Sequence, residues 1–238
     1  MICNARAVSE IKPPHPFLTL LEGRVIAEAG GLMLALPLLR LNARKGRGEP
    51  VIVLPGFMAD DRSTRILRNY LNQIGYQAIP WGLGTNRGPM LSMLPTLQNL
   101  ISDVASQTGH KVRLVGWSRG GMISRELARD NPGQIDRVIT IGSPVRGGIG
   151  ASAIGRWVQH ETGLTPQQMS RLTEERSRLP IRVPVRAIYS KSDGVVAWKA
   201  CIDDETEGIE HFEVIGSHVG LGSNVEVFRL LPRLLREA

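Results

Sequence analysis

Cysteine is scarce in this chain of 238 residues, which has only Cys3 and Cys201. Two cysteines form at most one disulfide, and neither lies in the C-x-x-C spacing of a zinc or redox site. We therefore expect two free thiols and no bound metal. The first residues also lack the charged-then-apolar order of a secretory signal, so we expect a cytoplasmic protein.

Long apolar runs are missing as well. The most apolar stretch, Ala29 to Leu39, is too short to cross a bilayer, and charged residues lie close on both sides of it. We expect this stretch to be a helix packed into the core. A helix lying on a membrane surface is the less favoured alternative.

Negative charge is in the minority: 29 Lys and Arg residues stand against 22 Asp and Glu, a formal net charge of +7. The excess is mostly arginine, and it is spread along the chain without an aromatic-interleaved basic stretch. Such a distribution is typical of a basic, solvated surface rather than of a nucleic-acid site. We expect no nucleic-acid partner.

From residue 50 onward, short β-branched runs alternate with longer helical segments. This pattern predicts an α/β fold, a mostly parallel sheet of about six strands flanked by helices, within a single domain over residues 1–238. The predicted strands are Val51–Leu54, Gln77–Pro80, Val112–Val115, Arg137–Ile141, Val185–Tyr189 and His211–Ile215. The predicted helices are Arg62–Ile74, Met93–Thr108, Gly121–Arg129 and Ser223–Arg236.

Two segments fall outside this alternation. Residues 1–48 form a helical N-terminal extension, with helices predicted over residues 17–29 and 32–41. Residues 144–183 separate two predicted strands by more than one crossover helix needs, and they begin with a glycine-rich run. Long connections of this kind are often active-site lids, so we expect a small lid here. An ordinary crossover helix with an enlarged loop is the alternative.

A G-x-S-x-G pattern, Gly116 to Gly120, lies between an apolar strand and a helix. In this context the pattern predicts a nucleophile on a sharp turn. The glycines leave room where strand and helix nearly touch. The turn lifts the serine Oγ clear of the backbone, near the positive end of the helix. We predict that Ser118 is a nucleophile.

A serine nucleophile needs a base, and His218 follows the last predicted strand. It belongs at the carboxyl edge of the sheet, where ligands gather in open α/β folds. His110 and His211 precede or begin their strands and belong at the opposite edge. Asp193 follows the fifth strand and completes the order Ser, Asp, His, so we predict that it orients the His218 base. The acidic residues 203–205 are the alternative, and we expect them to be solvated.

Acyl transfer also needs backbone donors for the oxyanion. The amide of Arg119, directly after the nucleophile, is one predicted donor. The amide of Phe57, after the first strand, is the other, with Met58 as the alternative. We expect an apolar substrate pocket lined by Phe57, Met58, Trp81, Met122, Val195, Val219 and Leu221. Packing in the core is the alternative for each of them, because these residue types are usually buried.

Five segments resemble lipases and esterases of the α/β-hydrolase superfamily: LPGF at 54–57, GHKVRLVGWSRGG at 109–121, TIGSPVRGG at 140–148, SKSDGVV at 190–196 and GSHVGLG at 216–222. The resemblance implies hydrolysis of a carboxylic ester through an acyl-enzyme, without metal or organic cofactor. It also implies the Phe57 and Arg119 amides as oxyanion donors.

Two alternatives stay open. An acyltransferase or thioesterase would use the same three residues, and a non-catalytic binding protein could have the same fold. Because we expect the apolar stretch to be buried and the lid helix is polar, we expect a small-molecule ester of short to medium acyl length.

Overall fold

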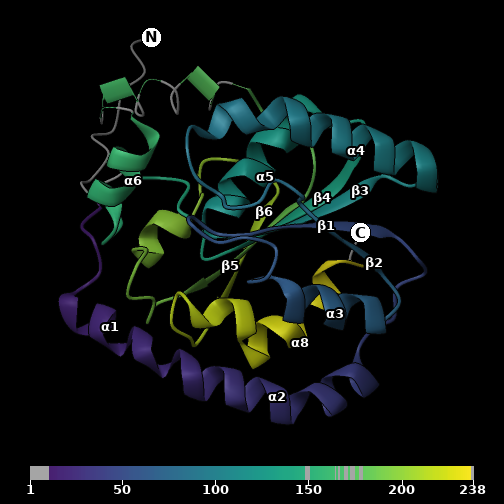
Figure 1. Cartoon of the computed structure of the whole chain (residues 1–238), viewed down its shortest axis with the longest axis horizontal. Coiled ribbons are helices and arrows are strands. Elements are labelled where there is room, and N and C mark those ends of the chain that lie inside the picture. Colours follow the sequence, from purple (N-terminus) through teal and green to yellow (C-terminus); the bar gives the residue numbers. More distant parts are fainter. Residues whose placement is uncertain are drawn as a thin grey trace.

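The sheet at the centre of the molecule has the strand order β2-β1-β3-β4-β5-β6, and all of its pairings are parallel (Figure 1). The computed structural model describes residues 11–147, 151–163, 165, 167–168, 171, 175–176 and 179–236. The strands are β1 Pro50–Leu54, β2 Gln77–Pro80, β3 Val112–Trp117, β4 Ile135–Ile141, β5 Val185–Ser190 and β6 Ile209–Val214. All six strands predicted from the sequence are present, with bounds that move by at most two residues.

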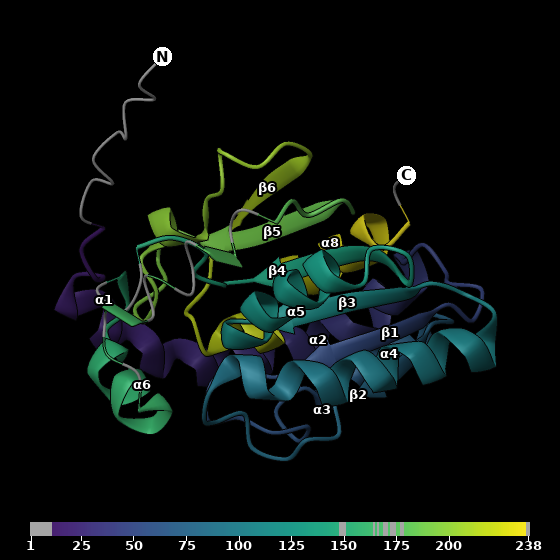
Figure 2. The same cartoon turned by 90° about the horizontal axis from the view of Figure 1, so that it is seen from above.

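Helices cover both faces of the sheet (Figures 1 and 2). Helices α4 (Leu94–Thr108) and α5 (Arg119–Asp130) lie on one face, and α3 (Arg65–Gln73) and α8 (Val225–Leu234) lie on the other. The side chain of Asn224 caps α8 by accepting the N–H groups of its first turn. Short helices occupy the connections: η2 Met90–Met93, α6 Gly155–Thr162, η4 Trp198–Cys201 and η5 Gly220–Ser223.

Because helices bury both faces of the sheet, the strands are continuous apolar runs in the sequence. In β1, Val51 and Val53 pack into the cluster of α3 and α8, while Ile52 and Leu54 pack into the cluster of α4 and α5. All four side chains are at most 1% exposed. Burial of each contributes roughly 1.5–3 kcal/mol.

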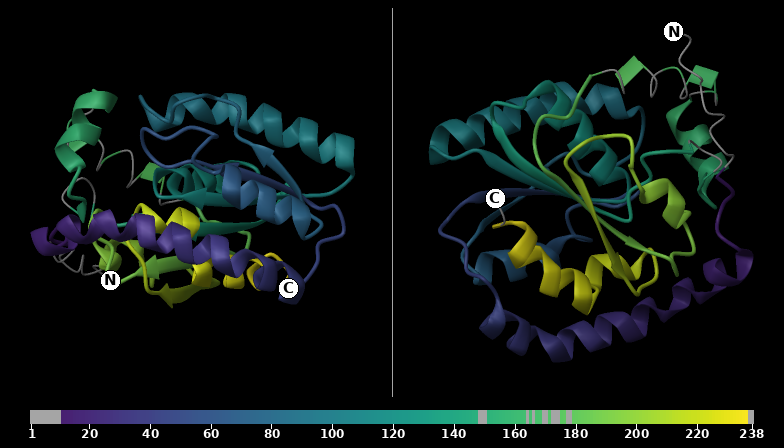
Figure 3. Two further views of the ribbon diagram at one scale, coloured as in Figure 1. Left: turned by 60° about the horizontal axis from the view of Figure 1, so that its bottom comes forward. Right: turned by 180° about the vertical axis from the view of Figure 1, so that it is seen from behind.

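The N-terminal extension forms one almost continuous helix, built from α1 (Pro16–Leu20), η1 (Leu21–Arg24) and α2 (Val25–Asn42). It runs along the outside of the molecule, beyond α8 and α3 (Figures 1 and 3). The two helices predicted over 17–29 and 32–41 are therefore joined. We call the whole segment Pro16–Asn42 the N-terminal helix.

The prediction that the apolar stretch packs into the core is correct for one side of the helix only. Leu32 and Leu36 are buried in the cluster of α3 and α8. Met33, Leu34 and Leu38 are 57%, 86% and 63% exposed. The prediction is wrong for these residues because only one narrow side of the helix contacts the body. By length and composition alone the helix could also cross a membrane.

The connection 144–183 lies between β4 and β5, and its described part begins against the body of the molecule. Ser152 forms an isolated β-bridge with Val196. Ala151 packs against Val196 and the buried free thiol Cys201. Parts of the remaining predicted lid lie outside the described residues. Cys3 also lies outside them. The described start of the connection is thus fastened to the loop that follows β5.

Candidate active site

The sheet topology brings two pairs of loops together at its carboxyl edge. The chain runs from β1 outward to β2 and then returns to β3 beside β1, so the strand order reverses between β1 and β3. Such reversals are where open α/β sheets bind ligands. Leu54 pairs with Gly116, so the loops after β1 and β3 start side by side. Ser190 pairs with Val214, so the loops after β5 and β6 do the same.

Ser118 occupies the sharp turn that the sequence predicts between β3 and α5. Its φ is 53° and its ψ is −121°, a strained conformation for a residue with a side chain. A Cβ at Gly116 would overlap the backbone of Gly120, and a Cβ at Gly120 would overlap the carbonyl of Leu54. Glycine is therefore required at both positions.

His218 lies between Ser118 and Asp193. Its Nε2 is 3.0 Å from Ser118 Oγ, and its Nδ1 is 2.6 Å from Asp193 Oδ2. The other carboxylate oxygen of Asp193 accepts the backbone N–H groups of Val195 and Val196, at 2.8 and 2.7 Å. The three residues are only 3–8% exposed. With its Nδ1 proton directed at Asp193, the imidazole has Nε2 free to accept the serine proton.

The other described histidines lie elsewhere. His15 caps α1 by accepting the Phe17 N–H at 3.2 Å. His211 Nε2 accepts the N–H of Asp203 at 2.9 Å, and burial lowers the pKa of its imidazole. His110 and His160 are exposed. Of the described histidines, only His218 is hydrogen-bonded to Ser118.

Of the acidic residues 203–205, which we expected to be solvated, only Asp203 is buried. Asp204 and Glu205 are exposed and pair with Arg146, as a solvated loop would. Asp203 is only 7% exposed and forms a buried ion pair with Arg125 of α5. The prediction of a solvated Asp203 is therefore wrong. Its ion pair tethers the acidic loop to α5.

The His218 segment is held by groups that sequence reasoning did not identify. The Trp117 indole N–H donates to the His218 carbonyl at 3.2 Å. The Glu22 carboxylate accepts three backbone N–H groups, from His218 at 2.8 Å, Val219 at 2.9 Å and Gly194 at 2.8 Å. Glu22 therefore joins the loop that carries Asp193 to the loop that carries His218.

Two more charged residues of the N-terminal helix bind the same loops. Glu28 accepts the N–H and the hydroxyl of Ser217 at 2.9 and 2.6 Å. Arg24 donates to the Ser192 carbonyl at 2.8 Å and to Glu28 at 3.0 Å. The i, i+4 spacing of Arg24 and Glu28 was visible in the sequence, but it predicts only a local pair.

Two backbone amides are available beside Ser118. The N–H groups of Phe57 and Arg119 have no hydrogen-bond acceptor within the described part of the chain. The alternative donor, Met58, is already occupied, because its N–H donates to the Asn86 carbonyl at 2.9 Å. The Asn86 side chain in turn donates to the Pro55 carbonyl at 2.8 Å and fixes the loop. The geometry therefore favours Phe57 over Met58.

The Arg119 side chain is buried without a counter-ion among the described residues. It is 7% exposed, donates to the Gly88 carbonyl and lies 5.6 Å from the centroid of the Phe57 ring. Its Nη1 is buried with no partner in the described part of the chain, and burial lowers the pKa of the guanidinium to about 10. A positive charge is thus held in the protein interior beside the Phe57 ring.

The residues predicted for the substrate pocket have different environments. Trp81 and Leu221 are fully buried in the core. The half-buried members are Phe57, Met58, Met122 and Val195. Val219 is 45% exposed. Sequence reasoning missed Trp157 of α6, whose ring meets the Phe57 ring edge-on at 5.2 Å between centroids. The connection between β4 and β5 therefore reaches the loop after β1.

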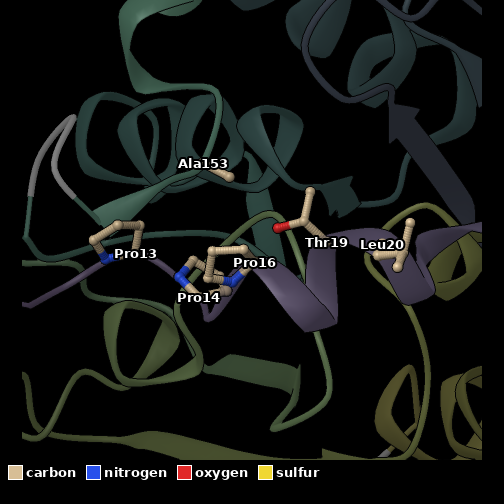
Figure 4. A pocket seen from close by; sticks show the side chains of 6 residues that line it. All are labelled: Pro13, Pro14, Pro16, Thr19, Leu20 and Ala153. Carbon is tan, nitrogen blue, oxygen red and sulfur yellow. The ribbon is translucent and has the colours of Figure 1, made fainter.

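An open groove of about 580 Å³ lies beside the loop that follows Asp193 (Figure 4). Its lining is mostly apolar: Pro13, Pro14, Pro16, Thr19, Leu20 and Ala153. The Thr19 hydroxyl donates to the Gly194 carbonyl at 2.6 Å, and the Ala153 N–H donates to the Val195 carbonyl at 2.8 Å. The groove thus lies where the N-terminal helix and the connection after β4 meet this loop.

Solved structures of the α/β-hydrolase fold resemble this chain. A lipase from Bacillus licheniformis matches with a TM-score of 0.62 and 15% identity, over 82% of this chain and 94% of that one. Mouse alpha/beta hydrolase domain-containing protein 10 matches at 0.59 and 16%, over 80% and 89%. A putative non-heme bromoperoxidase from Mycobacterium tuberculosis matches at 0.56 and 14%, over 82% and 95%.

No protein-family model and no curated protein matches the chain. The structural likenesses confirm the predicted fold: the chain has the α/β-hydrolase fold found in lipases and esterases.

Proposed function

We propose that this protein is a serine hydrolase that cleaves carboxylic esters through an acyl-enzyme. The observation that carries the proposal is the hydrogen-bonded series from Asp193 Oδ2 through His218 to Ser118 Oγ, with distances of 2.6 and 3.0 Å. Nucleophile, base and orienting carboxylate in this geometry are the arrangement that activates a serine hydroxyl.

In the proposed reaction, His218 Nε2 takes the Ser118 proton while Oγ attacks the ester carbonyl carbon. Asp193 stabilises the imidazolium, and the amides of Phe57 and Arg119 bind the oxyanion. The imidazolium then protonates the leaving alcohol. Water, deprotonated by His218, attacks the acyl-enzyme, and release of the acid restores Ser118.

The fold by itself does not select this reaction, since lipases, esterases and a bromoperoxidase all share it. The proposal rests instead on the site. A non-catalytic binding protein would have no need of a strained Ser118 bonded to a buried imidazole. An acyltransferase or thioesterase remains the second candidate, because only the acceptor or leaving group differs.

Turnover of p-nitrophenyl esters tests the proposal. Ser118→Ala should lower kcat by about 10⁴- to 10⁶-fold without unfolding the protein. Ser92→Ala, which changes an exposed serine of η2, is the matched control and should keep full activity. A fluorophosphonate probe should label Ser118 alone. Labelling of another serine, or an active Ser118→Ala variant, would overturn the assignment.

The same assay separates the two enzyme candidates. When an alcohol is added to the assay, a hydrolase should still release mainly the free acid. When an oxygen ester and a thioester of the same acid are compared, it should cleave the oxygen ester faster. Dominant transfer to the alcohol, or a preference for the thioester, would select the second candidate. Acyl chain length is a separate question, because the expectation of short soluble esters assumed a buried apolar stretch that is in fact mostly exposed.

A further inference from the structure

The outer face of the N-terminal helix is apolar along its whole length. Its large exposed side chains are Phe17, Leu20, Ile26, Met33, Leu34, Leu38 and Leu41, between 57% and 86% exposed. Between Pro16 and Asn42, no exposed residue carries a charge. A helix on the surface of a soluble protein normally has the reverse arrangement, with its polar face outward.

The charges of this helix are turned toward the body, which explains the reversal. Glu22, Arg24 and Glu28 bind the loops after β5 and β6. The Nε of Arg40 is buried as well. The polar side of the helix is thus used to hold the candidate active site, and the apolar side is left facing outward. Contiguous exposed apolar surface on this scale marks an interaction site.

The loop that carries His218 also exposes apolar side chains. Val219, whose N–H is bound by Glu22, is 45% exposed. Ile215, two residues before the Ser217 that Glu28 binds, is 77% exposed. Because Glu22 and Glu28 bind this loop to the helix, a surface that binds the helix would lie near the candidate active site.

Cations stand at both ends of the apolar face. Lys12 precedes the helix, and Arg44, Lys45 and Arg47 follow it. All four are exposed, and none makes an ion pair within the described part of the chain. An apolar helical face with basic residues at its margins is the pattern of a helix that lies in a lipid interface, where the cations meet anionic headgroups.

We propose that this face binds the surface of an anionic phospholipid membrane, with the N-terminal helix lying in the plane of the interface. The helix stands out along one edge of the molecule, so its apolar side chains can enter a lipid layer without rearrangement (Figure 3). This docking does not depend on the proposed ester hydrolysis, although it would bring the His218 loop close to lipid.

Two other occupants fit less well. In a dimer that packs this face on itself, either orientation of the two helices would bring cationic ends together, which is unfavourable. A membrane-spanning helix would have to give up the hydrogen bonds of Glu22, Arg24 and Glu28 and place those charges in hydrocarbon.

Vesicle co-sedimentation of the full chain tests the proposal. Vesicles of phosphatidylcholine mixed with phosphatidylglycerol should bind the protein at least about 10-fold more tightly than phosphatidylcholine alone, and salt should weaken the binding. The double variant Leu34→Gln, Leu38→Gln should lose about 10-fold or more in partitioning, because it removes two large apolar side chains that are 86% and 63% exposed. Its thermal unfolding should be unchanged.

Matched variants identify the interaction. Ile66→Gln changes an exposed apolar residue of α3, outside the face, and should bind vesicles like the wild type. Arg44→Gln with Arg47→Gln should weaken binding to the anionic vesicles only. Failure to bind either vesicle, or full binding by the Leu34, Leu38 double variant, would overturn the proposal.

Two further outcomes would also overturn it in favour of another occupant. A dimer in gel filtration that the Leu34, Leu38 double variant dissociates would identify a second copy. Retention in native membranes after alkaline carbonate extraction would identify a spanning helix. Because binding is measured without turnover, an inactive protein that still binds vesicles would contradict only the proposed hydrolase function.

Discussion

The Glu22 carboxylate accepts the backbone N–H of His218 at 2.8 Å. The same carboxylate accepts the N–H of Gly194, the residue after Asp193, at the same distance. One side chain of a helix outside the sheet thus fixes the spacing of the two loops that carry the proposed base and its orienting carboxylate.

We predict that Glu22→Ala lowers kcat about 10- to 100-fold while KM changes less than about threefold, because small displacements of catalytic groups slow the chemical step. Glu22→Gln should restore part of kcat, because its amide oxygen still accepts hydrogen bonds. Steady-state kinetics on a soluble ester, with Tm measured in parallel, separates positioning from stability.

The matched control for Glu22 is Glu213→Ala. Glu213 is an exposed residue of β6 that pairs with Lys191 at 2.7 Å, at the start of the loop after β5, but it binds none of the backbone N–H groups that Glu22 accepts. This variant should have wild-type kcat. If Glu22→Ala lowers only Tm and leaves kcat intact, Glu22 stabilises the fold without positioning the site.

The main features of the site were predictable because their signals are local. Ser118 lies in a short pattern between a strand and a helix, and His218 and Asp193 follow strand ends. Parallel strands bring all such ends to one edge, so sequence order alone places these residues near each other. Glu22 had no such signal. Its partners are backbone N–H groups up to 197 residues away, and backbone groups leave no mark on the sequence.

Burial was predicted less well than secondary structure. An apolar stretch has the same composition whether it faces the core or the outside, and Leu34 and Leu36 illustrate both cases. The same difficulty affected Asp203, whose neighbours are exposed while it pairs with Arg125, 78 residues earlier in the chain. Both outcomes depend on contacts between distant segments, which local patterns do not contain.

The role of Asp193 can be tested by its closest isostere. Asp193→Asn keeps an oxygen to accept the N–H groups of Val195 and Val196 but no longer favours the required His218 tautomer. We expect kcat to fall about 10⁴-fold, with the fold intact. Asp203→Asn serves as the comparison and should change kcat by less than about threefold. Equal losses in both variants would contradict the assignment of Asp193.

Asp203 should instead matter for stability. Asp203→Asn leaves the Arg125 charge buried and unpaired, so we expect the free energy of unfolding at pH 7 to fall by about 3 kcal/mol. Urea unfolding monitored by circular dichroism measures this change. If Asp203→Asn is as stable as the wild type, solvent rather than Asp203 stabilises the charge of Arg125.

The same ion pair predicts a pH dependence of stability. Burial alone would raise the Asp203 pKa, but the Arg125 charge and the hydrogen bonds from Thr206 lower it below its ordinary value. A lowered folded-state pKa contributes stability that is present above the unfolded-state value, near pH 4, and is lost as pH falls through the folded-state pKa. The free energy of unfolding of the wild type should therefore approach that of Asp203→Asn under acid conditions. A difference in the free energy of unfolding between the two proteins that stays constant down to low pH would contradict this prediction.

The side chain and the backbone of Arg119 can be separated by substitution. Arg119→Met keeps the N–H that is proposed to bind the oxyanion and replaces a buried, unpaired guanidinium with an apolar side chain of similar length. We expect Tm to stay the same or rise, because burial already lowers the pKa of this group. If the backbone amide carries the function, kcat should stay within about 10-fold, with a modest rise in KM from the lost bond to Gly88. A drop of about 10² or more in kcat at unchanged Tm would mean that the guanidinium itself stabilises the developing charge, since that is the effect of removing one oxyanion donor.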